Sequence, residues 1–263
     1  MIRSAAIVPF LVALAFAPAA ASGTSAICAP SDTPVYDDTI SGIASPCATN
    51  PGTIVVESTY IQNASSTGGT ALATYPVLTV RTGLAHDLAF VFDPPSEVAE
   101  SGLRGAGIYT PTRLGYGLSY TALQTDRSAL AIFTSVLPPV SRFSPNLVQS
   151  KYALGLTSDY ALGQKFTVGL AGEESSSATR GFDRIVPSGA LSASYAAAAD
   201  TAISTDVGTR VWGRKGIVQQ YSDVGVDESL SKHVVFKVGL GTTFNPAANS
   251  KPHYLASGVD YRI

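Results

Sequence analysis

Apolar and polar residues alternate along most of this chain with a period of two. In the stretch HVVFKVGLGTTF, the apolar residues Val234, Phe236 and Val238 are separated by polar or small ones, and RLGYGLSYTA, KYALGLTSDY and QKFTVGLAGE show the same alternation. A period of two predicts a β-strand with two different faces. About twelve such segments occur, each roughly nine to eleven residues long, the length that a tilted strand needs to cross a bilayer. They begin near Thr53, Tyr75, Asp87, Arg113, Ser128, Lys151, Gln164, Gly189, Ala202, Ile217, His233 and His253.

The links between these segments alternate in length. AHD, QTDR, ALGQ, AADT and SLSKH are tight turns, whereas NASSTGGTALAT, DPPSEVAESGLRGAGIYTPT, LPPVSRFSPNLVQS, EESSSATRGFDRIVPS, WGRKG and NPAANSKP are longer. Short periplasmic turns and long external loops are typical of outer-membrane barrels. We therefore predict an all-β fold, a transmembrane antiparallel β-barrel of about twelve strands over residues 53–263. An even number of strands places both ends of the barrel in the periplasm.

A soluble β-sandwich or a lipocalin-like barrel is the alternative, because it produces the same alternation with its apolar side chains inside. The polar faces of the segments decide in favour of the membrane. They carry glycines and single charges, and charged residues make up only 14% of the chain. The outer face of a soluble protein is normally rich in lysine and glutamate.

The first residues predict export. MIRSAAIVPFLVALAFAPAAAS has an early arginine, an apolar run and a small-residue end, the pattern of a signal peptide cut after Ala21. An uncleaved membrane anchor is the alternative. Residues 22–52 would form a short periplasmic segment. Its two cysteines, Cys28 and Cys47, are the only ones in the chain, and in an oxidising compartment we expect them to form a disulfide. The predicted location is the bacterial outer membrane.

The chain ends in the middle of an alternating segment. Val259, Tyr261 and Ile263 share one face, and Asp260 lies on the other. This ending fits a barrel, because the last strand of a barrel pairs with the first and leaves no free edge. The three apolar residues would face lipid. The spacing of Gly258, Tyr261 and Ile263 also resembles the signal read by the barrel-insertion machinery, although the usual last residue there is Phe or Trp.

Charged residues on the polar faces are the main candidates for function. We predict that they face the lumen, where they line an aqueous path or pair with one another and fill it. Both signs occur in similar numbers. These residues are Glu57, Arg81, Lys151, Lys165, Asp206, Arg210, Asp223, Lys237 and Asp260. The carboxylate pairs Glu173–Glu174 and Asp227–Glu228 fall where loops are expected to begin, so we interpret them as solvated charges.

Several stretches resemble the outer-membrane transporter family named for the MetA-pathway of phenol degradation. VVESTYIQN resembles its first strand, YPVLTVRTGLAHDLAFVF its second hairpin, RLGYGLSYTALQTDRSALAIFTSVLPPV its central hairpin, and LSKHVVFKVGLGTTFN with HYLASGVDYRI its closing pair. A charged residue common in the family after the second turn is replaced here by Ala89. The resemblance implies transport of small molecules, aromatic ones among them.

The leading functional prediction is passive passage of a small solute across the outer membrane. A non-conducting structural or surface-binding barrel is the alternative, and a membrane-embedded hydrolase is a more remote one. His86, His233 and His253 lie at turns or loops outside any Gly-x-Ser-x-Gly motif, so we predict no enzyme activity. No ligand spacing indicates a metal or a cofactor. The expected partners are outer-membrane lipid, the insertion machinery and the solute. A net charge of −2 argues against nucleic acid.

Overall fold

The structure, a computed structural model, describes residues 27–28, 45–64, 71–95, 97–101, 107–111, 114–137, 151–179, 182–212, 217–244 and 253–263. The predicted signal peptide lies outside them. Fourteen strands make up the described part, and all of their pairings are antiparallel. The strands are β1 (Ile54–Ala64), β2 (Ala71–Ala85), β3 (Leu88–Asp93), β4 (Glu97–Ser101), β5 (Gly107–Pro111), β6 (Gly115–Gln124), β7 (Ser128–Leu137), β8 (Lys151–Ala161), β9 (Phe166–Thr179), β10 (Phe182–Ala196), β11 (Thr201–Trp212), β12 (Ile217–Ser231), β13 (Val234–Phe244) and β14 (His253–Arg262).

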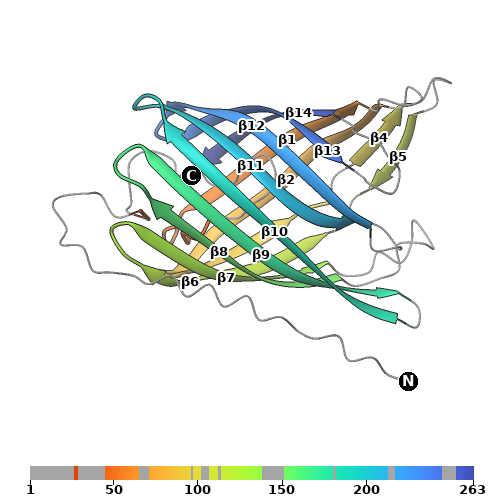
Figure 1. Cartoon of the computed structure of the whole chain (residues 1–263), viewed down its shortest axis with the longest axis horizontal. Helices are drawn as coiled ribbons and strands as arrows, with labels where there is room; N and C mark the ends of the chain where they lie inside the picture. Colours follow the sequence, from red (N-terminus) through yellow and green to blue (C-terminus); the bar gives the residue numbers. More distant parts are fainter. Residues whose placement is uncertain are drawn as a thin grey trace.

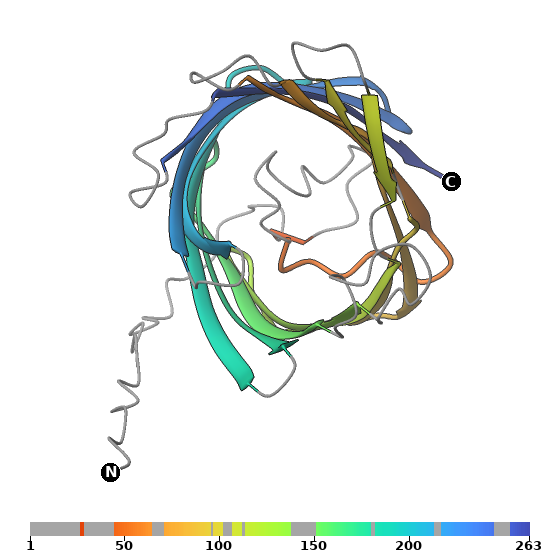
Figure 2. The same ribbon diagram turned by 90° about the vertical axis from the view of Figure 1, so that its right-hand side faces the viewer.

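The sheet closes on itself through its first and last strands (Figures 1 and 2). β1 pairs with β14 on one side and with β2 on the other. Ile54 and Ile263 exchange both backbone hydrogen bonds, at 3.2 and 2.8 Å, so the chain end is held as a strand. β4 and β5 extend ring strands beyond one end of the barrel and add none to the ring, which therefore has twelve strands. The predicted barrel is confirmed, and closure explains why an alternating segment can run to the end of the chain.

β4 and β5 are outward continuations of β3 and β6. Between Ala71 and Gly83, β2 pairs with β4 and then with β3 in the same register, and β5 pairs with β4 in the same register as β6 with β3. Pro94 and Pro95 separate β3 from β4, since proline supplies no backbone N–H to a sheet ladder. The expected loop over residues 93–112 is therefore wrong in part, because ten of its residues form a hairpin.

Two other predicted loops are shorter than expected. β9 continues to Thr179 and β10 begins at Phe182, so most of EESSSATRGFDRIVPS is strand. β2 begins at Ala71, which removes the end of NASSTGGTALAT. These stretches are rich in serine, alanine and threonine and lack an apolar face, and the hydrophobic period therefore gave no signal for them.

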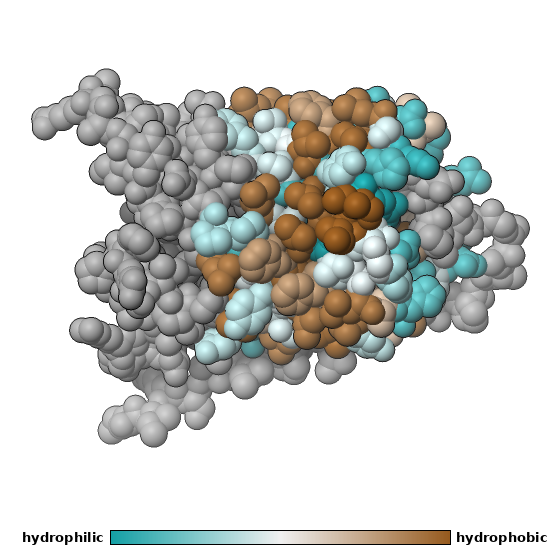
Figure 3. Space-filling view, turned by 180° about the vertical axis from the view of Figure 1, so that it is seen from behind, coloured by the Kyte–Doolittle hydropathy of each residue, from teal (hydrophilic) through white to brown (hydrophobic). Residues whose placement is uncertain are grey.

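The two faces of the wall differ as predicted. On β6, Tyr116, Leu118 and Tyr120 are exposed while Gly117 and Ser119 between them are buried. The same holds along β8 and β13. Figure 3 shows apolar side chains gathered over the middle of the outer wall, with polar ones at one end. Exposed apolar residues around a closed barrel form a lipid-facing band. No helix in the described part of the chain could cross a bilayer.

The tight turns all lie at the end of the barrel that also holds Ile54 and Ile263, and we call it the short-turn end (Figure 1). An incomplete ring of exposed aromatic side chains lies beside these turns on the outer face. Its members are Tyr120, Tyr160, Phe166, Tyr195 and Tyr261. Aromatic rings at this level are typical of the boundary between hydrocarbon and water.

Candidate functional site

Two ion pairs lie on the inner wall at the seam where the barrel closes. Nε of Arg81 is 3.1 Å from Oε1 of Glu57, and Nζ of Lys237 is 2.5 Å from Oδ2 of Asp260. All four side chains are less than a tenth exposed. Glu57 and Asp260 are direct register partners across the seam. Like charges opposite one another destabilise a strand pair, and here each carboxylate has its own cation on the neighbouring strand.

A second row of polar side chains crosses β11 to β14. Asp206 and Asp223 are register partners, and Asp223 is followed across the sheet by Gly241 and Tyr254. The phenol of Tyr254 donates a hydrogen bond of 2.5 Å to Oδ2 of Asp223. It reaches that far because Gly241 leaves its path open, and a Cβ at Gly241 would collide with the Tyr254 ring. Asp206 is 1% exposed.

Two other inward aromatic rings also lie over glycines of the adjacent strand. Phe133 lies over Gly155 and Tyr221 over Gly208, each pair in direct register. Each ring occupies the space that a Cβ on the glycine would take, so it lies close to the wall. These pairings account for three of the glycines on the polar faces, namely Gly155, Gly208 and Gly241.

The described inner wall is predominantly acidic. Asp227 and Glu173 lie within β12 and β9, and Asp227 is buried, so their interpretation as charges at loop starts is wrong. The expectation of similar numbers of both signs does not hold for the described side chains. The acidic ones are Glu57, Asp93, Asp159, Glu173, Asp206, Asp223, Asp227 and Asp260, and the basic ones are Arg81, Lys237 and Arg262.

Three of the predicted basic residues need separate comment. Lys165 is exposed in the turn before β9, and its Nζ lies 5.9 Å from the centroid of the Tyr195 ring. Tyr195 belongs to the outer face, so placing Lys165 in the lumen is wrong. Lys151 and Arg210 belong to β8 and β11, and their side chains lie outside the described part.

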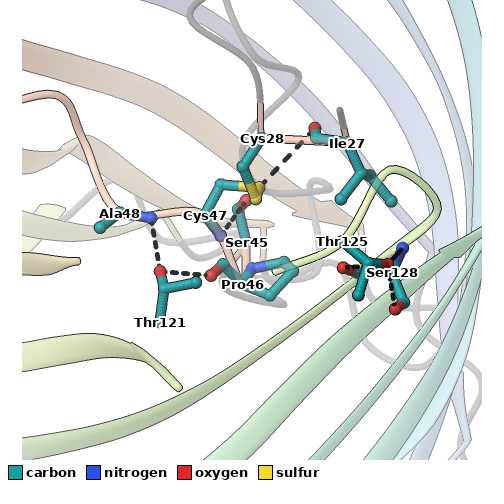
Figure 4. Close-up of a disulfide and its surroundings, with 9 residues drawn as sticks. All are labelled: Ile27, Cys28, Ser45, Pro46, Cys47, Ala48, Thr121, Thr125 and Ser128. Atoms are coloured by element: carbon teal, nitrogen blue, oxygen red, sulfur yellow. Dashed lines mark hydrogen bonds between the residues drawn. A yellow bond between two sulfur atoms is a disulfide. The ribbon is translucent and has the colours of Figure 1, made fainter. Parts of the chain in front are cut away.

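Residues 45–53, which we call the mouth segment, cross the interior of the ring at the short-turn end (Figure 2). The Thr121 hydroxyl on the inner wall of β6 donates to the carbonyl of Pro46 at 2.8 Å and accepts from the amide of Ala48 at 3.0 Å (Figure 4). On β2, Gly83 exchanges backbone hydrogen bonds of 3.2 Å with Gly52 and Thr53. A side chain at Gly83 would strike backbone oxygens of this segment.

A disulfide joins the mouth segment to an earlier part of the chain. Cys47 is bonded to Cys28, which confirms the predicted disulfide, and Pro46 beside it is almost fully buried. The wall around Thr121 consists of small side chains. Ala131 faces Thr121 in register and is 0% exposed, and Ala89 pairs with Ser119 in the same region. These small side chains lie beside Thr121, the wall residue that binds the mouth segment. The alternation of polar and apolar residues gave no sign of this contact.

The C-terminal residues occupy the expected faces. Tyr261 and Ile263 are exposed on the outer wall, and Gly258 is buried inside, where a Cβ would approach the carbonyl of Ser58 on β1. Their recognition by the insertion machinery stays a prediction.

His86, His233 and His253 are all exposed. Nδ1 of His233 lies 3.0 Å from the carbonyl oxygen of Arg262, a contact at the end of the barrel. Among the described residues, no three His, Cys, Asp or Glu side chains are grouped to hold a metal ion. The inner wall can therefore offer carboxylates, hydroxyls and a few cations to a polar solute, with the mouth segment across one end.

Solved structures with the same fold include an outer membrane channel from Pseudomonas putida F1. It superposes with a TM-score of 0.64 at 14% identity, over 82% of this chain and 97% of the other. The NanC porin superposes with a TM-score of 0.54 at 10% identity, over 79% of this chain and 98% of the other. No protein-family model matches the sequence, and no curated protein matches it. These likenesses show the outer-membrane barrel fold.

Proposed function

We propose that this protein is a channel of the bacterial outer membrane for passive passage of small polar solutes, with its short-turn end toward the periplasm. The observation that carries the proposal is the contrast between the two faces of one closed ring. The outer face is apolar, and the inner face holds buried ion pairs and carboxylates. Polar side chains turned inward in a membrane barrel support an aqueous path. The channel and the porin that share the fold are consistent with this role.

The excess of carboxylates on the described inner wall supports a preference for cations. Acidic side chains lining a pore attract cations and repel anions. The aromatic solutes implied by the family resemblance are a separate expectation. If aromatic solutes do pass, the acidic inner wall would repel aromatic acids and would neither attract nor repel neutral aromatic molecules.

Planar-bilayer recordings of the purified barrel test the proposal. We expect discrete conductance steps, and under a potassium chloride gradient a reversal potential of the sign that cation preference gives. Swelling of protein-loaded liposomes with a small sugar, an amino acid and benzoate would rank the solutes. Correct folding is checked by heat-modifiable migration on gels. A folded barrel that shows neither conductance nor swelling would refute the channel.

A non-conducting barrel is the second candidate, and one observation favours it. Several inner residues have almost no exposure, among them Ala131, Ala256, Val235, Thr157 and Asp206. A lumen filled by inner side chains would stiffen the barrel and block solutes. The same recordings separate the two candidates, and the mouth segment is the first part to alter if the wild type is closed.

A further inference from the structure

We propose that the barrel wall opens sideways between β10 and β11, at the end away from the short turns, and that small amphipathic molecules with neutral or cationic head groups pass there between the lumen and the outer leaflet. We call this place the fork, and it is formed by residues 182–188 of β10 and 210–212 of β11. The proposal goes beyond the channel proposed above and does not require conduction through the short-turn end.

The ladder between β10 and β11 ends before the strands do. Its last pair is Gly189 with Thr209. Beyond that pair β10 continues along β9 to Phe182, and β11 continues along β12 to Trp212, so the β9–β10 hairpin parts from β11 (Figures 1 and 2). In the described part of the chain, no other two neighbours in the ring both continue more than one residue past their ladder at this end.

The direction of the backbone groups in β10 follows from hydrogen bonds at its other end. The amide of Ala196 donates to the carbonyl of Lys165, beside β9, at 2.8 Å. The amide of Ala197 donates to the carbonyl of Thr201, in β11, at 3.0 Å. Successive residues of a strand direct their backbone groups to opposite neighbours. Because no register shift interrupts β10, its odd-numbered residues direct N–H and C=O toward β11.

Pro187 explains where the ladder ends. After Gly189 and Thr209, the next hydrogen-bonded pair would be Pro187 with Val211. Proline has no N–H, so Pro187 cannot donate to the carbonyl of Val211. Within sheets, proline is confined to strand edges and bulges. The edge of β10 that faces the fork is therefore built into the sequence.

The fork begins at the level of the bilayer. A tilted strand climbs about 2.5 Å per residue across the membrane, and the apolar band of a barrel is about 25 Å tall. Pro187 is eight positions from Tyr195 in the aromatic ring, which places it about 20 Å farther from the short-turn end. Leu191 and Val207, on the outer face just before the fork, are 44% and 48% exposed. The base of the fork therefore lies within the apolar band.

At this depth, backbone outside a ladder is tolerated where it lines a space filled with water. The side chains at the base of the fork leave room for such a space. Ser188, Gly189 and Ala190 are small and half-buried. A Cβ at Gly189 would meet only the carbonyl oxygen of Ala171, at 3.5 Å. Water from the lumen can thus reach the fork, and the lumen communicates there with lipid.

The two sides of the wall select the solute. Leu191 and Val207 are apolar on the outside, so an alkyl or aryl tail can stay in lipid. On the inside, Asp206 lies three positions from Thr209 on β11, and Asp223 is its register partner. These carboxylates attract a cationic head group and repel an anionic one. An amphipathic molecule can therefore cross the fork with its head in the lumen and its tail outside.

Cysteine labelling in liposomes tests whether the fork is open. Both native cysteines are in the disulfide, so an introduced cysteine is the only free thiol. Ala190→Cys lies on the inner face at the fork, and Ala153→Cys on the inner wall of β8 is the matched control. Each variant is treated with dodecyl maleimide dissolved in the bilayer and with a water-soluble maleimide. The ratio of the two rates corrects for burial, and we expect it to be about tenfold higher for Ala190→Cys, because thiol modification follows access.

Pro187→Val in the Ala190→Cys background restores the missing donor. The amide of Val211 should then exchange its hydrogen more slowly, and the labelling ratio should fall to that of Ala153→Cys. Pro111→Val, in β5 outside the ring, should change neither. A ratio that stays high after the Val211 amide becomes protected would overturn the fork as the entry point. Unchanged exchange at Val211 would overturn the role of Pro187.

The outcomes also separate this proposal from the channel. Equal ratios for Ala190→Cys and Ala153→Cys overturn the fork, whatever the conductance. A high ratio at Ala190→Cys in a barrel that never conducts refutes the channel and leaves the fork standing.

The choice of head group has its own test. Decyltrimethylammonium and decyl sulfate, below their micellar concentrations, are compared for their ability to slow labelling of Ala190→Cys by the water-soluble maleimide. We expect the cation to protect at a concentration about tenfold lower, because the inner wall is acidic. Equal protection, or better protection by the sulfate, would overturn the preference for cationic heads.

Discussion

Replacing Lys237 with glutamine is expected to destabilise the barrel strongly. Nζ of Lys237 lies 2.5 Å from Oδ2 of Asp260, with side chains 7% and 9% exposed, and Asp227 is its register partner on β12. Glutamine keeps much of the size of the side chain and removes its charge. The two carboxylates then lose the cation that offsets them. Breaking one partner of a buried ion pair costs about 3–5 kcal/mol, whereas an exposed pair is worth at most about 1 kcal/mol.

We take about 3 kcal/mol, the lower part of that range, because the inner wall of a barrel can admit water more readily than a protein core. For a domain of this size, 3 kcal/mol corresponds to a loss of roughly 6–12 °C in melting temperature. The melting temperature is measured by circular dichroism in detergent, and the free energy of unfolding by urea titration in lipid vesicles. Lys232→Gln is the matched control, since Lys232 is exposed in the turn before β13. It should change stability by less than about 0.5 kcal/mol.

A double variant makes the test specific to the pair. Asp260→Asn in the Lys237→Gln background removes the carboxylate that has lost its cation, so it should recover part of the lost stability. Coupling between the two substitutions of about 0.5–3 kcal/mol is expected for residues in contact. A loss for Lys237→Gln no greater than that for Lys232→Gln would refute the reasoning. It would mean that the inner wall is solvated well enough to screen the charges.

Three further predictions address other parts of the molecule. Leu240→Arg, in the middle of the lipid-facing side of β13, should lower the stability of the inserted barrel by about 2–4 kcal/mol. Leu84→Arg, beside a short turn, should cost about 1 kcal/mol or less. Equal effects of the two variants in vesicle unfolding titrations would contradict the assignment of the outer face. Gly241→Ala should cost about 1–3 kcal/mol because its Cβ would strike the Tyr254 ring. Gly172→Ala, with nothing within 4 Å of its Cβ, is the control, and similar melting temperatures for the two variants would count against the ring–glycine contact. Deleting Tyr261, Arg262 and Ile263 should leave an exported chain that does not insert, since the seam with β1 is lost, and a heat-modifiable barrel in outer-membrane fractions would show closure to be dispensable.

The strands could be predicted from the sequence because a membrane barrel imposes a local pattern. Each strand must present apolar residues to lipid and can present almost anything inward, so the period of two persists in β6, β8 and β13. The pattern failed where strands extend beyond the apolar band. The sequences of β4, β5 and the outer halves of β9 and β10 have no regular alternation of apolar and polar residues, so the pattern gave no strand there.

The inner wall was less predictable than the outer one. The structure buries six of the residues that alternation assigned to the polar face, namely Glu57, Arg81, Asp206, Asp223, Lys237 and Asp260. That they line a path for a solute stays a prediction. It missed Asp227, although this residue is four positions from Asp223 and so shares its face, because a loop was expected to begin there. Extending the alternation as far as the turn before β13 would have placed Asp227 on the inner face.

The sequence by itself determined the barrel, its number of ring strands, its inside and outside, and its disulfide, because these follow from residue spacing and from there being two cysteines. Only the tertiary structure decided which charges pair, because partners such as Lys237 and Asp260 lie on different strands and meet through the register of the sheet. It also brought the mouth segment against Thr121, more than seventy positions away in sequence. Such a contact cannot be predicted from the alternation of apolar and polar residues, because it depends on where the closed ring places Thr121 relative to the mouth segment.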